Sequence, residues 1–373
     1  MRQKLLFLAL IIGSSCYVAE DVAPDQQIWD YSFPDDQGIS SQTLLGLNER
    51  IQFNQFSEIN GLIIIKNDQL IFENYFNRKV DDLGTITRPP TLKNRELASN
   101  IGNASLIFAL SAIAIADDKR ILSLEDPIHT YLPAYSDVFN DDPNKEDITI
   151  AHLLAHRSGF SWNGSFQPFS IENDINQMKL ANDWIRFILE KPLEAPAGLR
   201  YNFNAGAGLI LSKIIENASG QDYVTFLREN LLDPLTISSF EIGVDPQGNF
   251  NSADGIAVTL LDLTKLGYLY IQDGTWQGRK IIDPNFIAEA TSVQSEVSGT
   301  LTAGYIWNFF GIDFLASFGV PHNEIFYISG GIGQSIYIIP SENMIVSIFA
   351  ENYFFGFVNP SLNLFAEITH TFI

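Results

Sequence analysis

The chain is poor in cysteine and in basic residues. It has 373 residues but a single cysteine, Cys16, so no disulfide can form within one copy. Only 22 lysines and arginines stand against 44 aspartates and glutamates, which gives a net charge of −22. A nucleic-acid partner is therefore disfavoured, because phosphate binding needs clustered basic side chains. The acidic excess instead predicts a self-repelling surface.

Long apolar runs are also missing. No stretch of 18 apolar residues follows the N-terminal region, so no membrane-spanning helix is expected in the rest of the chain. Hydrophobic residues nevertheless make up 46% of the sequence and aromatic residues 12%. This composition is ample for a packed core and argues against disorder. The length suits one large domain or two small ones.

The first 16 residues have the features of an export signal. A short basic region, 1–4, precedes the apolar run 5–13, which is too short to span a bilayer, and the segment ends in Gly-Ser-Ser-Cys. Small residues before Cys16 resemble a bacterial lipoprotein processing site, with an ordinary secretory signal as the alternative. We therefore predict a signal peptide over 1–16, lipidation at Cys16 and a tether over 17–30. The protein would be exported, either lipid-anchored in the bacterial cell envelope (periplasmic or surface) or secreted.

Strand patterns occur at both ends of the remaining sequence and helical patterns occur between them. Two β-rich runs surround a polar turn in 61–73, and the pattern recurs in 334–349. Helical periodicity is found in 104–117, 148–156, 182–189, 209–218 and 262–271. This order predicts an α+β fold in which one sheet is built from distant parts of the chain.

Four segments resemble, in family order, motifs of the serine β-lactamase and penicillin-binding protein family, nearest its esterase and amide-hydrolase branch. They are 148–160 (similar to I-x-H-L-L-x-H-x-S-G-L), 196–206 (P-x-G-x-x-F-x-Y-x-x-G), 254–267 (G-L-x-x-T-x-x-D-L-x-x-x-G) and 330–334 (G-H-G-G-Q). The resemblance implies a β-lactamase/DD-peptidase-like domain over 31–373. It implies an antiparallel sheet from about 55–100 and 270–373, flanked by helices, with an inserted, mainly helical subdomain over about 103–265.

The catalytic positions of that family are altered in this sequence. The resemblance implies a serine nucleophile at a helix start and a lysine one turn later, but these positions hold Asn103 and Leu106. The ungapped distance to the Ser-Leu-Glu-Asp-Pro segment 123–127 fixes this alignment. No S-x-x-K and no G-x-S-x-G occurs anywhere in the chain.

Two further family positions have also lost their proton-transferring groups. The tyrosine that would relay a proton is replaced by Phe203. Tyr201 lies nearby, but strand-like spacing would point it to the other side. The edge-strand position, normally lysine or histidine before small residues, holds Gly331, Ile332 and Gly333.

The replacements are mutually consistent, because a buried lysine or hydroxyl without its partners is destabilising. We therefore expect a catalytically degenerate member with no catalytic residue.

Backbone donors would survive such changes. In the family, two N–H groups form the oxyanion hole, and the resemblance implies those of Asn103 and Gln334 here. We expect a pocket that holds a small acyl or carboxylate ligand, or a cell-wall-derived one, in a binding or structural module at the cell envelope. The first alternative is an active serine-hydrolase-like enzyme of esterase, amidase or β-lactamase type with an unrecognised nucleophile. The second is a peptidoglycan-binding lipoprotein.

Two histidines have the spacing of zinc ligands on a helix. His152 and His156 are four residues apart, but the glutamate of H-E-x-x-H is missing and no third ligand suggests itself. We interpret both as structural, and we expect neither a metal nor a cofactor.

Overall fold

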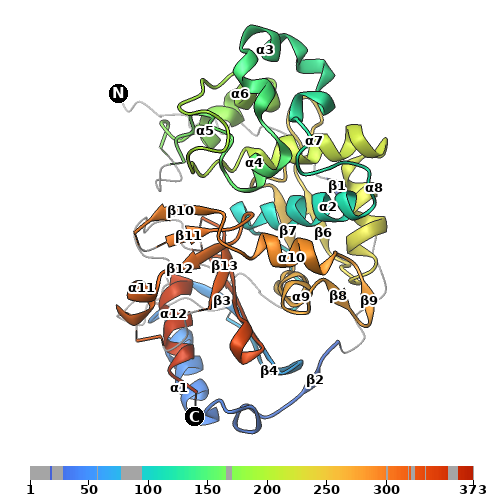
Figure 1. The fold of residues 1–373 in the computed structure, drawn as a ribbon. Coiled ribbons are helices and arrows are strands. Elements are labelled where there is room, and N and C mark those ends of the chain that lie inside the picture. Colours follow the sequence, from blue (N-terminus) through green and yellow to red (C-terminus); the bar gives the residue numbers. More distant parts are fainter. Residues whose placement is uncertain are drawn as a thin grey trace, which may run out of the picture.

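The computed structural model describes residues 17–18, 28–56, 58–76, 95–164, 170–299, 301–317, 319–320, 324–331, 333–351 and 360–372. The predicted signal peptide and Cys16 lie outside these residues, as does Ile332. Figure 1 shows a sheet with its covering helices in the lower part of the molecule and a mainly helical part above it. No helix within the described ranges is both long and apolar enough to cross a bilayer.

The large sheet joins the two ends of the chain. In the described part of the chain it has nine strands, in the order β10-β11-β12-β13-β14-β15-β3-β4-β2. Neighbouring strands are antiparallel except β2, which pairs with β4 in parallel. Their bounds are β2 Asp30–Tyr31, β3 Ile59–Lys66, β4 Gln69–Tyr75, β10 Ser295–Ser298, β11 Leu301–Ala303, β12 Asn308–Phe310, β13 Phe326–Ser329, β14 Ser335–Ile339 and β15 Met344–Ala350. The predicted α+β fold, with one sheet from distant segments, is confirmed.

Both predicted hairpins are present. The first turns at Asn67 and Asp68, whose φ angles of 49° and 62° are the left-handed values that a tight hairpin turn demands. Every residue of β3 is buried. Alternate side chains serve different cores, because Ile63 belongs to the core on one face of the sheet and Ile64 to the core on the other. Helix α9 packs on the first face, and α12, which contacts α1, packs on the second.

The remaining elements cover the sheet or build the helical part. The helices are α1 Ser41–Gln52, α2 Leu106–Asp118, α3 Ser136–Asp141, α4 Ile150–Leu154, α5 Asp174–Leu180, α6 Trp184–Leu189, α7 Ala207–Ser219, α8 Tyr223–Leu227, α9 Leu260–Ile271, α10 Pro284–Ala290, α11 Ile312–Ser317 and α12 Pro360–Thr369. A small sheet has the order β1-β6-β7-β5, with β1 Tyr17–Val18, β5 Ser99–Asn100, β6 Phe240–Ile242 and β7 Ile256–Val258. The hairpin of β8 Thr275–Trp276 and β9 Arg279–Lys280 follows α9.

Helix α2 lies at the centre of the molecule. All eleven residues from 106 to 116 are buried, and the helix packs on α7 and α8. An α-helix that is apolar on every side has to be surrounded by other elements. The buried helix predicted over 104–117 is therefore confirmed, with its first residues forming the 3₁₀ turn η2, Gly102–Ser105.

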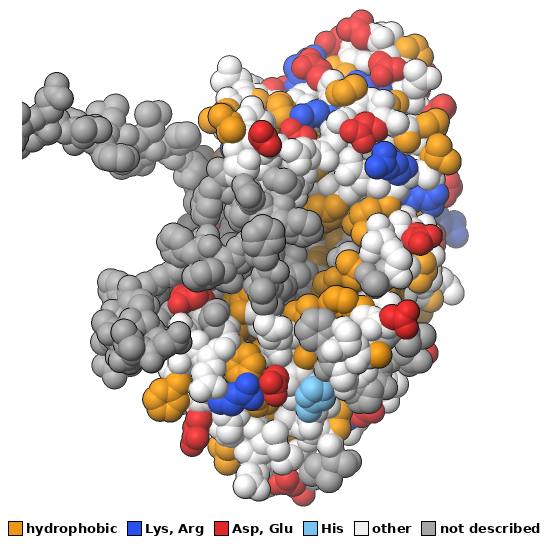
Figure 2. All heavy atoms as spheres, turned by 90° about the vertical axis from the view of Figure 1, so that its left-hand side faces the viewer, with side chains coloured by type: hydrophobic (Ala, Val, Ile, Leu, Met, Phe, Trp, Pro, Cys, Tyr) orange, Lys and Arg blue, Asp and Glu red, His pale blue; other side chains and the backbone are white. Residues whose placement is uncertain are grey.

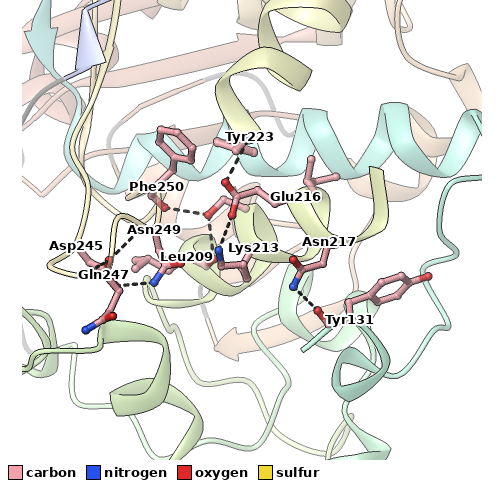
Figure 3. A network of polar contacts seen from close by, with 12 residues as sticks. Tyr131, Leu209, Lys213, Glu216, Asn217, Tyr223, Asp245, Gln247, Asn249 and Phe250 are labelled. Atoms are coloured by element: carbon pink, nitrogen blue, oxygen red, sulfur yellow. Dashed lines mark hydrogen bonds and ion pairs between the residues drawn. The ribbon is translucent and has the colours of Figure 1, made fainter. Parts of the chain in front are cut away.

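Buried polar contacts hold the helical part around α7 (Figure 3). The Asp245 carboxylate, which is 3% exposed, accepts the backbone N–H groups of Gln247 and Asn249 at 2.8 Å each and the Asn249 side-chain amide at 2.9 Å. The next residue, Phe250, accepts the Ser212 hydroxyl of α7 at 2.9 Å through its carbonyl oxygen. The bond from Ser212 to Phe250 fixes this loop to α7. The donors around Asp245 hold the loop's own shape, because a buried carboxylate needs several donors.

Candidate active site

The start of α2 is shaped by Asn100. Its side-chain amide donates to the Asp254 carbonyl at 2.9 Å, and its side-chain oxygen accepts the Gly102 N–H at 2.8 Å. Gly102 takes a φ of 55°, which lets the chain leave β5 and enter η2 at once. Asn103 follows as the second residue of η2 and is partly exposed. Its N–H has no acceptor within the helix, because the first turn of any helix leaves its donors free.

Leu106 lies one turn beyond Asn103. Its side chain is 1% exposed and belongs to the main hydrophobic core. Residues three apart eclipse each other in a 3₁₀ turn, so positions 103 and 106 stand on the same side. The position that the motif resemblance aligns with the family's lysine is thus filled by a fully buried apolar side chain.

The turn between β13 and β14 lies directly on the start of this helix. A Cβ at Gly330 would overlap the carbonyl oxygen of Ile101, and a Cβ at Gly102 would stand 3.3 Å from the Gly331 nitrogen. Gly330 and Gly331 are therefore brought to the helix start, whereas a Cβ at Gly333 would meet Ala350 and Ser361. The position of Ile332 lies outside the described residues.

Gln334 is anchored beneath the same turn. Its side chain is 1% exposed, and its amide nitrogen donates to the Ala350 carbonyl at 3.1 Å. Its own carbonyl accepts the Gly330 N–H at 2.7 Å, and Ser361 donates to the Gly333 carbonyl. The backbone on either side of the Gln334 N–H is therefore held rigidly. That this N–H and that of Asn103 converge on one ligand stays a prediction.

Phe203 and Tyr201 both contact His156. The ring centroids of Phe203 and His156 are 4.7 Å apart, and those of Tyr201 and His156 are 5.9 Å apart. The expectation that Tyr201 points to the opposite side does not hold, because residues 201–204 are not a strand. Burial raises the pKa of the Tyr201 phenol to about 12, so this hydroxyl stays protonated at neutral pH.

His156 is buried as a neutral imidazole. It follows α4 with a φ of 53°, and its Nδ1 accepts the Asn204 N–H at 3.4 Å. Burial lowers its pKa from 6.5 to about 4. Within the described part of the chain, His156 Nε2 and both polar side-chain atoms of Asn204 are buried and have no hydrogen-bond partner. Buried polar atoms without partners destabilise a folded protein. Those of His156 and Asn204 form a polar cluster beside Phe203 that no sequence motif indicates.

The two histidines of the zinc-like spacing have separate roles. His152 Nδ1 accepts the Thr149 N–H at 3.2 Å, and the Thr149 hydroxyl accepts the His152 N–H at 3.3 Å, which closes a capping box at the start of α4. Helix α4 ends at Leu154, so His156 lies beyond it. The spacing of four therefore does not place both imidazoles on one helical face.

The start of α2 and the β13–β14 turn meet where the helical part joins the sheet. Figure 2 shows hydrophobic side chains near the middle of a face of the molecule, beside residues that are not described. A helix start opposite the turn of an antiparallel sheet, with a mainly helical insertion above, defines the serine β-lactamase and penicillin-binding class of fold. The beta-lactamase family model matches residues 61–357, and the chain belongs to this family.

Curated relatives and solved structures agree with this assignment. An Escherichia coli protein provisionally named D-alanyl-D-alanine carboxypeptidase is 23% identical over 247 residues, which are 64% of this chain and 55% of that protein. The N-acetylmuramyl-L-alanine amidase of Bacillus subtilis is 24% identical over 183 residues, covering 47% of this chain and 40% of that protein. The chain thus spans about half the length of the curated relatives that it matches.

The structural similarity extends over nearly the whole chain. EstCE1, a hydrolase with promiscuous acyltransferase activity, superposes with a TM-score of 0.69 at 15% identity, covering 90% of this chain and 99% of that one. A class C beta-lactamase mutant superposes with a TM-score of 0.62 at 17% identity, covering 88% and 97%. At sequence identities of 15% and 17%, the similarity to these structures establishes the fold alone.

The contact between the β13–β14 turn and the helix start predicts a difference between two adjacent glycines. Gly330→Ala is expected to destabilise the protein by about 1–3 kcal/mol, because its methyl group overlaps the Ile101 carbonyl. Gly331→Ala is the matched control, since a Cβ there meets nothing within 4 Å. Urea unfolding of both variants measures the difference. Equal stabilities would contradict the close approach.

Burial of His156 predicts a loss of stability in acid. Its pKa is about 4 in the folded protein, below the ordinary value of 6.5, so the unfolded chain takes up the proton first. The contribution of neutral His156 to the free energy of unfolding is complete above pH 6.5. It is lost as the pH falls towards 4, by about 3 kcal/mol in total. Urea unfolding across this range should show the decline. His156→Asn, which tolerates the left-handed backbone, should flatten it.

The exposed His370 supplies the control for this experiment. His370→Asn should leave the acid limb of the stability curve unchanged. Burial also lowers the pKa of His152, so part of the slope should remain in His156→Asn. A wild-type stability that stays constant from pH 6.5 to 4 would contradict the burial of His156 as a neutral ring.

Proposed function

We propose that this member of the beta-lactamase family is catalytically degenerate and binds a ligand at the cell envelope. The observation that carries the proposal is Leu106, which is 1% exposed in the apolar helix α2 at the position of the family's lysine. An ionised lysine in these surroundings would need a partner. Asn103, at the position of the nucleophile, has no acidic proton for a neighbouring base to remove.

The surroundings of Phe203 support the same proposal. A phenylalanine cannot relay a proton, and the neighbouring His156 is too weak a base to be charged at neutral pH. The Tyr201 phenol stays protonated at neutral pH. The side chains at the family's catalytic positions are thus unsuited to acyl transfer.

Ligand binding is proposed through the backbone. The N–H groups of Asn103 and Gln334 would hold a carbonyl or carboxylate oxygen without any side-chain participation. The name of one relative refers to D-alanyl-D-alanine, a dipeptide with a free carboxylate, and another is named as an amidase of the N-acetylmuramyl-L-alanine linkage. We therefore propose a cell-wall-derived peptide ending in a carboxylate as the ligand.

The predicted leader supports the proposed location. Cell-wall chemistry takes place outside the cytoplasmic membrane, which agrees with a signal peptide over 1–16. Lipidation at Cys16 would hold the protein at the membrane.

Covalent probes test the loss of catalysis. The wild-type protein should not be labelled by a fluorescent penicillin or by a fluorophosphonate, since removing the serine of such a site costs on the order of 10⁶ in kcat. In-gel fluorescence is the measurement, and Asn103→Ser combined with Leu106→Lys and Phe203→Tyr is the comparison variant. Labelling of the wild-type protein would contradict the proposal. Mapping the labelled peptide would then locate the nucleophile of an active hydrolase.

A pair of variants tests the backbone donor. Asn103→Ala keeps the N–H of residue 103, whereas Asn103→Pro removes it at a position in the first helical turn that tolerates proline. Acetyl-D-alanyl-D-alanine should bind the alanine variant as tightly as the wild type and the proline variant roughly tenfold more weakly. Calorimetry measures binding, and thermal unfolding checks that both variants fold. Equal affinity for the C-terminally amidated dipeptide would rule out recognition of the carboxylate.

A further inference from the structure

Residues 196–203 form a surface segment that packs on two histidines. This segment, which we call the flap segment, contains neither helix nor strand, and each of its residues is partly or fully exposed. Tyr201 and Phe203 lie at its end, beside the candidate active site. Surface segments with little buried apolar area open locally more readily than a core does. Opening of the flap segment would therefore alter the surroundings of that site.

His156 lies beneath the end of the flap segment. The rings of Tyr201 and Phe203 contact its imidazole, and its backbone carbonyl accepts the Asn202 N–H at 2.8 Å. Its Nδ1 also accepts the Asn204 N–H, which a protonated ring cannot do. Burial is the largest cause of its low pKa, about 4. A charged His156 is therefore stable only where water can reach the ring.

His152 lies beneath the first half of the flap segment. A Cβ at Gly198 would stand 2.8 Å from His152 Nε2, so the ring touches the backbone of the segment. The Nδ1 atom of the same ring accepts the Thr149 N–H, and protonation would end this bond. The Gly198 N–H donates to the Arg157 carbonyl at 2.8 Å and so holds the segment over the ring.

The charges around His152 also favour its neutral form. Burial has the largest effect and lowers its pKa, and the positive charge of Arg157 lowers it further. The Arg157 guanidinium is fixed at the flap segment, because it donates to the Gly198 carbonyl oxygen. Glu125 and Asp147 raise the pKa of His152, but the net shift is downward.

Unpaired polar atoms also oppose the closed arrangement. Among the residues that the structure describes, His156 Nε2 and both polar side-chain atoms of Asn204 are buried and lack a hydrogen-bond partner. Opening of the flap segment would give these atoms water as a partner. The closed arrangement is therefore destabilised even before a histidine is protonated.

We propose that the flap segment is a pH-sensitive cover, which opens locally in mild acid and displaces Tyr201 and Phe203. Protonated His152 and His156 are stable only in the open arrangement, where water surrounds both rings. Both pKa values are lowered in the closed arrangement, so closure is fully favoured above pH 6.5 and is weakened as the pH falls below it. The shape of the candidate active site consequently depends on pH.

Hydrogen–deuterium exchange on the full chain tests the proposal without a ligand, so its outcome does not depend on the proposed function. Protection of the flap segment, corrected for the intrinsic pH dependence of amide exchange, should fall by roughly tenfold between pH 7.5 and 5.5. This factor follows if opening returns the pKa of His156 from about 4 to 6.5, and His152 adds to it. Helix α2 should stay more strongly protected throughout, because its buried amides exchange only when the whole fold opens.

Two variants and a control assign the effect to the histidines. His152→Gln keeps a capping-box acceptor for the Thr149 N–H but cannot be charged, and His156→Asn removes the buried imidazole. Each substitution should reduce the pH dependence of exchange in the flap segment. His370→Gln should leave it unchanged, because His370 is exposed and lies beyond α12. His152 is only partly buried, so its variant keeps the test available if His156→Asn does not fold.

Each outcome decides the proposal. A reduced pH dependence in His152→Gln, with that of His370→Gln unchanged, supports it. Constant protection of the flap segment between pH 7.5 and 5.5 overturns it. Protection equal to that of α2 also overturns it, because the segment would then open only with global unfolding. An undiminished pH dependence in both His152→Gln and His156→Asn would assign the effect to other groups, with the same consequence.

Discussion

The burial of α2 on every side is the constraint around which the molecule is arranged. A helix without a polar face cannot lie on a surface, so α7 and α8 have to pack on it from the helical part. The first turn of helix α2 also has to be covered, and the glycine-containing loop between β13 and β14 packs on Ile101 there. The site at this helix start is therefore a product of core packing. If Leu106 stands at the position of the family's lysine, as we propose, it removes the conflict between burying this position and keeping a charge there.

The proposed loss of catalysis would leave the fold unchanged. The glycine turn meets Ile101 through backbone atoms, and the hydrophobic core that the two parts share is made of apolar side chains. Asn100 bends the chain into η2 by means of its own amide. None of these contacts requires a serine, lysine or tyrosine. The same architecture can consequently carry an active hydrolase or, as we propose here, a binding protein.

Local patterns in the sequence were sufficient for much of the fold. The two hairpins were predictable because β-rich runs flank polar turns, and α2 because a continuous apolar run of its length has to be buried. The surroundings of Phe203 were not predictable from spacing. The expectation that residues two apart and their neighbours alternate between two sides assumes a strand. Tyr201 and Phe203 instead lie in an irregular segment that places both rings against His156. The packing of Trp29 on Trp276 has no motif at all, because these residues are far apart in the sequence.

The position of β15 has a consequence for how the chain folds. This strand lies between β14 and β3, so Lys66 near the start of the chain pairs with Met344 near its end. Until the last strand arrives, the β3–β4 hairpin has no partner along one edge and its apolar faces are uncovered. Pairings between such distant residues form slowly, because a long loop must close first. A nascent chain therefore cannot complete this sheet. Export before folding would suit such a topology, since the whole sequence would reach its destination before the central pair of strands is made.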